Sequence, residues 1–272
     1  MGAVEGTHRL NEDVSVTSQH LSSDVSHDGM VATITLRHPP SNLLHIEMIE
    51  EINSALLALR GQAGLKVLVL RGQGDVFCGG LDLREHNRDK VGRLMQVFHR
   101  VFETMRLLEV ISVAAVNGRA VGAGFELALG CNLVVASASA RFSLPEVGMG
   151  VFPAVACVVL PRVSPRRKAM EWILLGESIA ASELASFGLV NRVFPEGDFD
   201  VGLNGFLGQL IANSGPVMQF ARRAQTESYY ATYEDALYKA ENFYLRDLMG
   251  LSDPHEGVRA HLEQRPPRWR NA

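Results

Sequence analysis

Two glutamates near glycine-rich turns are the residues of this chain whose type and spacing could do chemistry. Glu126 closes the glycine-rich segment 118–126, and Glu146 follows twenty residues later. A single glutamate on a mostly apolar stretch is usually solvated or paired. Two carboxylates beside one site can instead share acid–base work, because one can hold a water as its base while the other delivers a proton.

Two junctions supply a setting for such a site. The first is Gly79-Gly80-Leu81-Asp82, and the second spans residues 118–126. Glycine lets a backbone approach a ligand closely, and a helix that begins there directs its free amides and positive dipole end at an oxygen. A lone Gly-Gly is more often only a tight turn. Neither junction reads GxGxxG or GxxxxGK[ST], and GxSxG is absent, which argues against nucleotide dehydrogenases, P-loop enzymes and α/β-hydrolases.

The surrounding sequence predicts an α/β core. Apolar, β-branched runs at residues 30–36, 66–70, 111–116 and 131–136 predict strands. Helical spacing of apolar residues predicts helices over 46–60 and 91–108 and a short helix from about Phe125. Strand, helix and strand in that order indicate a parallel sheet. Residues 1–28 are mostly polar, so we expect a flexible N-terminal extension there. From residue 166 the pattern is almost wholly helical. We therefore expect an α/β core over residues 29–200 and a helical C-terminal region over residues 201–272.

Composition limits the classes of partner. The net charge of the 272 residues is -4, which argues against a nucleic-acid binder. The sequence contains no run of 18 apolar residues, so no membrane span is predicted. The acidic residues near the start argue against a transit peptide. The three cysteines, Cys78, Cys131 and Cys157, form no CxxC pair and fit a reducing cytoplasm.

Metal and thiol chemistry are not expected from the spacing. The nine histidines include no HxxxH or HExxH motif, so no metal site is predicted. His86 is expected on a surface loop, with a position at the mouth of the site as the alternative. Cys78 lies close to the first glycine turn but has no evident base beside it, and is expected to be a buried structural thiol.

Three ordered strings carry a resemblance to a known family. They are FCGGLDL at 77–83, AVNGRAVGAGFELA at 115–128 and LPEVG at 144–148. Together they closely resemble the enoyl-CoA hydratase/isomerase (crotonase) superfamily, and the likeness extends from about Val31 to the C-terminus.

The resemblance implies a crotonase (ClpP-like) fold, in which ββα units stack and a helical C-terminal region assembles trimers or hexamers. It implies an acyl-CoA substrate, with coenzyme A entering only as part of that substrate and no permanently bound cofactor. The family's two oxyanion-hole amides fall on Leu81 and Ala123, and its two hydratase glutamates fall on Glu126 and Glu146. The residues expected to contact the thioester and coenzyme A are Gly80, Leu81, Asp82, Leu83, Gly122 and Ala123.

Residues 83–91 and 150–162 look like those of cyclohexa-1,5-diene-1-carbonyl-CoA hydratases. Phe152, Pro153, Val155 and Cys157 replace a loop that is usually rich in glycine, which favours a compact cyclic acyl group. The alternative is a purely structural role, in which residues 150–162 only pack against the next helix. Within the fold, isomerisation, decarboxylation or hydrolysis of an acyl-CoA or carrier-tethered acyl thioester also remains open, as does a catalytically idle binding protein.

Overall fold

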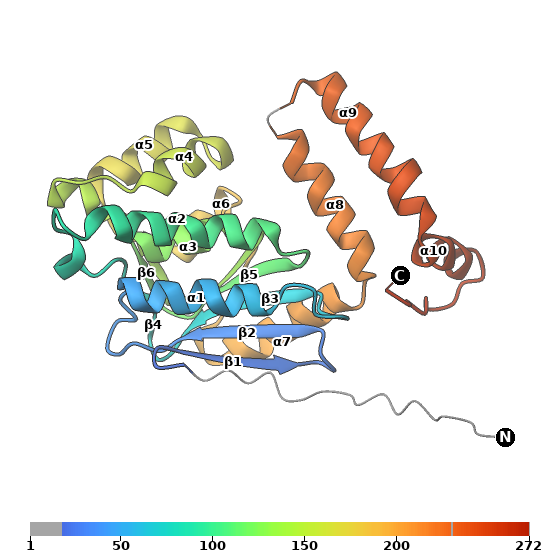
Figure 1. The fold of residues 1–272 in the computed structure, drawn as a ribbon, viewed down its shortest axis with the longest axis horizontal. Helices are drawn as coiled ribbons and strands as arrows, with labels where there is room; N and C mark the ends of the chain where they lie inside the picture. Colours follow the sequence, from blue (N-terminus) through green and yellow to red (C-terminus); the bar gives the residue numbers. More distant parts are fainter. Residues whose placement is uncertain (1–17, 230, 272) are drawn as a thin grey trace.

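A six-stranded sheet forms the centre of the molecule. The computed structural model describes residues 18–229 and 231–271 (Figure 1). The first strand pairs antiparallel with the second, and the other neighbours are parallel. In spatial order the strands are β1 (Leu21–Ser26), β2 (Val31–Leu36), β3 (Val67–Gly72), β5 (Ile111–Val116), β7 (Leu133–Ser137) and β10 (Arg192–Phe194).

A second, four-stranded sheet alternates with the first along the chain. Its strands are β4 (Val76–Cys78), β6 (Arg119–Val121), β8 (Arg141–Ser143) and β9 (Ile179–Ala180). The chain visits the large sheet and then the small one before each of α2 (Val91–Leu107) and α3 (Ala123–Leu129). These repeated ββα units confirm the predicted crotonase fold. They also place the two glycine-rich turns at neighbouring strands, because β4 pairs with β6.

Helices cover both faces of the large sheet. Successive side chains of a strand point to opposite faces, so apolar residues of the strands lie on both sides. Along β2, Ala32, Ile34 and Leu36 join the main core beneath α1 (Ile46–Ala58) and α2, whereas Val31 faces the opposite side. That opposite side is covered by α7 (Phe199–Ile211), whose Phe199, Leu203 and Leu207 pack on the valines of the sheet.

The remaining helices lie toward the C-terminal end of the chain. Figure 1 shows α8, α9 and α10 as an arm that stands beside the α/β core. Among the described residues, no helix is long and apolar enough to cross a membrane. The helices of the chain after α3, apart from α7, are α4 (Ala154–Val163), α5 (Arg166–Leu175), α6 (Ala181–Ser186), α8 (Gly215–Ser228), α9 (Tyr233–Asn242) and α10 (Ser252–Leu262).

Two expected boundaries are wrong. The predicted extension over 1–28 includes β1, an edge strand of the sheet; residues 1–17 lie outside the described part of the chain. The pattern missed β1 because Leu21 is its only buried residue and the others are polar or partly exposed. The predicted boundary at residue 200 cuts through α7, which belongs to the core because its apolar face covers the sheet.

Candidate active site

A cavity of about 620 Å³ opens where the two glycine-rich turns meet. It is walled mainly by apolar side chains, including Val91 and Met95, which lie one turn apart on α2. The structure brings together every site residue expected from the sequence: Gly80, Leu81, Asp82, Leu83, Gly122, Ala123, Glu126 and Glu146 all line this cavity.

Glycine is required at the turns because other elements touch their backbones. A Cβ on Gly124 would overlap the carbonyl of Cys78, so glycine allows α3 to pack directly on β4. Gly122 has a φ of 54°, and a Cβ there would overlap the carboxylate of Glu146. Gly80 has a φ of 97° and lies against the backbone of Val121. Substitution at any of the three would therefore separate groups that the cavity holds together.

The two expected oxyanion donors lie on these turns. Leu81 forms an isolated bridge with Leu44, in which the Gly80 carbonyl accepts from the Leu44 amide and the Asp82 amide donates to the Leu44 carbonyl, both at 2.9 Å. Peptide groups alternate direction in extended chain, so the Leu81 amide points to the other side. Ala123 is the first residue of α3, where an amide has no partner inside its helix.

Glu126 is buried in the first turn of α3 and holds the start of α4. Its Oε1 accepts the amides of Val155 at 2.8 Å and Ala156 at 2.9 Å. Pro153 precedes α4 and makes no side-chain cap, so Glu126 supplies the capping acceptor from another element. Burial raises the pKa of Glu126 to about 7, the Ala156 amide opposes the rise, and the charge of Glu146 adds to it.

Glu146 comes from the turn of 3₁₀ helix Pro145–Met149, and its carboxylate lies over Gly122. Its Oε2 is buried and has no hydrogen-bond partner in the part of the chain that the structure describes. Burial also raises the pKa of Glu146. Two carboxylates with raised pKa values therefore line one mainly apolar cavity, an arrangement suited to proton transfer.

The comparison with known families decides the assignment. The family model of enoyl-CoA hydratase/isomerase matches residues 26–272. The chain belongs to this family. The match covers both sheets apart from edge strand β1, both glycine-rich turns and the C-terminal arm, so the resemblance carried by the three sequence strings is confirmed.

Relatives of known name within the enoyl-CoA hydratase/isomerase family have different substrates. The chain is 32% identical over 247 residues to 2,3-dehydroadipyl-CoA hydratase of Escherichia coli, covering 89% of this chain and 96% of the relative. It is 29% identical over 259 residues to cyclohexa-1,5-dienecarbonyl-CoA hydratase of Thauera aromatica, covering 95% and 100%. An enoyl-CoA hydratase structure from Bacillus anthracis superposes with a TM-score of 0.88 at 27% identity, covering 93% and 100%.

Side chains around the cavity refine the predicted roles. The carboxylate of Asp82 pairs with Arg84, which holds the pKa of Asp82 below its usual range. Asp82 thus orders the turn that carries Leu81, although it lines the cavity. His86 lies in a loop, is partly buried and lines the cavity, which agrees with the alternative position expected for it at the mouth of the site. Cys78 is fully buried and its pKa is raised to about 12 by burial, as expected for a structural thiol.

The segment after Glu146 lines the cavity only in part. Phe152 and Pro153 face it, and Phe152 is 67% exposed at its rim. Val155 and Cys157 do not line it, because α4 begins at Ala154 and turns their side chains toward the main core. The predicted wall of four residues is therefore two residues long. Sequence reasoning also missed the backbone amides that hold Glu126, which no side-chain pattern reveals.

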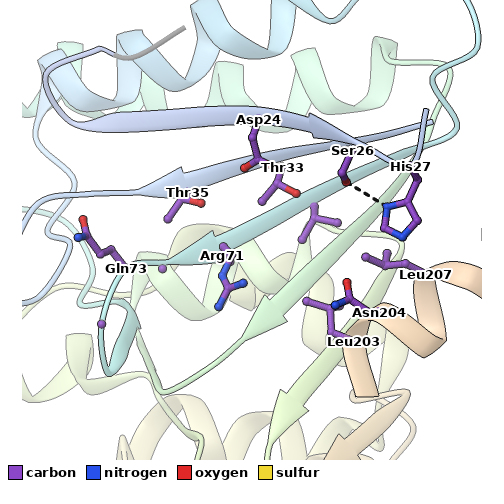
Figure 2. A pocket seen from close by; sticks show the side chains of 13 residues that line it. Asp24, Ser26, His27, Thr33, Thr35, Arg71, Gln73, Leu203, Asn204 and Leu207 are labelled. Carbon is purple, nitrogen blue, oxygen red and sulfur yellow. Dashed lines mark hydrogen bonds between the residues drawn. The ribbon is translucent and has the colours of Figure 1, made fainter. Parts of the chain in front are cut away.

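A second cavity, of about 510 Å³, lies on the other face of the large sheet (Figure 2). Thr33 and Thr35 project from β2 toward α7, and Arg71 projects from β3 and pairs with Asp200 at 3.1 Å. Ser26 and His27 hydrogen-bond at 3.0 Å across its end. Neither Glu126 nor Glu146 lines this second cavity, and the Arg71 guanidinium is already paired with Asp200.

Proposed function

We propose that this protein adds water across the α,β-double bond of an acyl-CoA thioester. The observation that carries the proposal is the pair Glu126 and Glu146, which line one cavity together with the turns that carry Leu81 and Ala123. Family members that perform other reactions on a thioester need stabilisation of the enolate. Hydration needs in addition one group that activates water and one that supplies a proton.

The proposed mechanism follows from the charge that develops. When water adds to the β-carbon, the thioester carbonyl becomes enolate-like, and the Leu81 and Ala123 amides donate to its oxygen. The loss of one such donor typically costs about 3–4 kcal/mol of transition-state stabilisation. Glu126 activates the water and Glu146 supplies the proton to the α-carbon. The charge of Glu146 contributes to the raised pKa of Glu126, so the protonation of one carboxylate affects that of the other.

A compact cyclic dienoyl group is the acyl group we propose. Phe152 and Pro153 form the part of the cavity wall next to Glu126, and proline fixes its backbone φ. The relative from Thauera aromatica, named for a cyclic dienoyl-CoA, supports this choice. The relative from Escherichia coli, named for an open-chain substrate, supports the alternative of a linear acyl group.

The experiment is a panel of thioesters assayed by mass spectrometry. Crotonyl-CoA, decenoyl-CoA and cyclohexa-1,5-diene-1-carbonyl-CoA are each incubated with the purified protein. A gain of one water supports the proposal, whereas loss of CO2 or of coenzyme A indicates decarboxylation or hydrolysis, and a product of unchanged mass indicates isomerisation. Tight coenzyme A ester binding without turnover of any thioester would indicate a binding protein.

We also propose a homotrimer or homohexamer in a reducing, cytoplasmic compartment. Large apolar side chains on the arm are exposed in the single chain, among them Tyr233, Tyr238 and Leu245 at 63–76%. Burial of such a surface against other copies is favourable. The three cysteines are free, which fits a reducing compartment.

A further inference from the structure

Three histidines that are distant in sequence form a cluster beside the start of α1. His20 precedes β1, His38 follows β2, and His45 precedes α1. The ring centroids lie 4.5 Å apart for His20 and His45, 4.8 Å for His38 and His45, and 5.3 Å for His20 and His38. The antiparallel pairing of β1 with β2 produces this cluster, because the Arg37 amide donates to the carbonyl of His20.

Two of the rings are held by backbone hydrogen bonds. His38 Nδ1 donates to the Leu43 carbonyl at 2.8 Å, and His45 Nδ1 accepts the Met48 amide at 3.0 Å as the cap of α1. A backbone bond of this kind fixes the orientation of a ring, as is common around metal-binding histidines. Burial first, and then His20 and His38, lower the pKa of His45, whereas Glu85 and Glu47 oppose the shift.

The third ring presents a nitrogen with nothing to bind. His20 is only 8% exposed, and its Nε2 has no hydrogen-bond partner within the described ranges. A buried polar atom without a partner costs about 1–3 kcal/mol. Oε2 of Glu47 lies 4.0 Å from this nitrogen, beyond hydrogen-bond distance. One donor atom from each of His20, His45 and Glu47 lies within 4.8 Å of the other two.

We propose that His20, His45 and Glu47 bind a divalent transition-metal ion such as Zn²⁺. Two imidazoles and a carboxylate are ligands that Zn²⁺ accepts at about 2.0–2.2 Å, with a water in the fourth position. The donor atoms lie within 4.8 Å of one another, whereas those of a tetrahedral set with such bonds lie about 3.4 Å apart. Binding therefore requires side chains to rotate inward, and the Glu47 side chain, which is 69% exposed, has room to do so. His38 packs edge-on against both rings and keeps them in place.

The ion has to compete with the present role of His45. Because Nδ1 accepts the Met48 amide, the neutral ring carries its proton on Nε2. Binding through Nδ1 therefore displaces the Met48 amide, and binding through Nε2 moves the ring proton to Nδ1, which also ends the hydrogen bond from that amide. In both cases the ion ties β1 to the start of α1, next to Leu44, whose backbone pairs with that of Leu81. The proposal is independent of the reaction that the protein catalyses.

Isothermal titration of the full chain with ZnCl2, repeated with CoCl2 to record visible absorption, tests the site. We expect one ion per chain and a rise in Tm with Zn²⁺. His20→Ala and His45→Ser should each weaken binding by about 10- to 100-fold, the range that even loss of an outer-shell partner produces. Serine replaces the helix cap while it removes the ligand. Glu47→Gln changes an exposed side chain, so it tests the site without risk to the fold.

The control is His261→Ala, which removes an exposed histidine of α10 and should bind Zn²⁺ like the unaltered protein. Absence of binding at about 100 µM Zn²⁺ would overturn the proposal, since useful sites bind far more tightly. Unchanged affinity in both His45→Ser and Glu47→Gln would overturn it equally. A weakening confined to these variants, with the control unchanged, would establish the ligand set.

Discussion

Glu126 has a raised pKa although two backbone amides donate to it. Such hydrogen bonds and the positive end of α4 favour the charged form, whereas burial favours the neutral form. Burial is the largest cause and raises the pKa to about 7. The backbone hydrogen bonds hold the carboxylate in one orientation, and burial makes it basic enough to take a proton from water. Neither effect alone would give both properties.

Glu126→Gln and Glu146→Gln should each lower kcat by about 100-fold or more, the usual contribution of a general acid or base. A glutamine oxygen still accepts the amides of Val155 and Ala156, so coenzyme A ester binding should persist. Steady-state loss of enoyl-thioester absorbance and calorimetric binding measure the two effects. Near-normal turnover in either variant would remove that residue from the mechanism.

The pH profile should show an acid limb near pH 7. Glu126 must be ionised to activate water, so kcat/KM should rise as the pH increases through about 7, the pKa of its carboxyl. Measurement of kcat/KM from about pH 5 to pH 9 tests this expectation. A rate that is flat across this range would assign the base to another group.

The same pKa predicts a stability gain on loss of the charge. Because the folded pKa lies above the ordinary 4.5, the folded state is favoured below pH 4.5, and this advantage disappears as the pH rises through about 7. Each pKa unit corresponds to about 1.4 kcal/mol, so Glu126→Gln should stabilise the protein by up to about 3 kcal/mol at pH 8. Denaturant unfolding measures this, and the exposed Glu177→Gln is the control. A destabilised Glu126→Gln at pH 8 would contradict the burial argument.

At the scale of elements, the start of α3 allows an oxyanion donor to be removed cleanly. Ala123 is the first helical residue, a position that tolerates proline. Ala123→Pro removes the amide proton, whereas Ala123→Val adds bulk and keeps it. We expect kcat to fall by about 10²- to 10³-fold in the proline variant and clearly less in the valine variant. Equal rates in the two folded proteins would disprove the oxyanion role.

The short segment before α4 should set the preferred acyl shape. Phe152 and Pro153 stiffen one wall, so kcat/KM should be highest for cyclohexa-1,5-diene-1-carbonyl-CoA, lower for crotonyl-CoA and lowest for decenoyl-CoA. Phe152→Ala should reduce the preference for the ring over decenoyl-CoA by about tenfold, since pocket contacts contribute about 1–3 kcal/mol. Leu174→Ala, an exposed apolar change on α5, is the control. If crotonyl-CoA is the best substrate, the cyclic-dienoyl assignment is wrong.

At the scale of the whole molecule, the arm of α8–α10 exposes apolar residues that a single chain leaves in water. Leu245 is 68% exposed there, whereas Val201 is 74% exposed on α7 of the core. Leu245→Asp should shift the mass measured by light scattering toward the monomer, because it buries a charge in the proposed interface. Val201→Asp should leave the mass unchanged. A monomeric unaltered protein would contradict the oligomer.

The amino-acid sequence by itself determined the α/β class, the main strands and helices, and the family. Apolar periodicity reports burial directly, and the glycine strings mark turns that other elements approach closely, as Gly122 and Gly124 show. It therefore also indicated Glu126, Glu146 and the turns that carry Leu81 and Ala123, all of which line one cavity.

Other features depended on contacts between residues distant in the sequence. Only the fold shows that backbone amides of α4 hold Glu126, because a backbone donor leaves no side-chain signature. Edge strand β1 was missed because all its residues except Leu21 are polar or exposed to some degree, which leaves no apolar alternation. The pairing of β1 with β2 then brought His20 to His45 across 25 positions, a proximity that no local histidine spacing could reveal. Local pattern determined the elements, and tertiary packing determined which side chains meet.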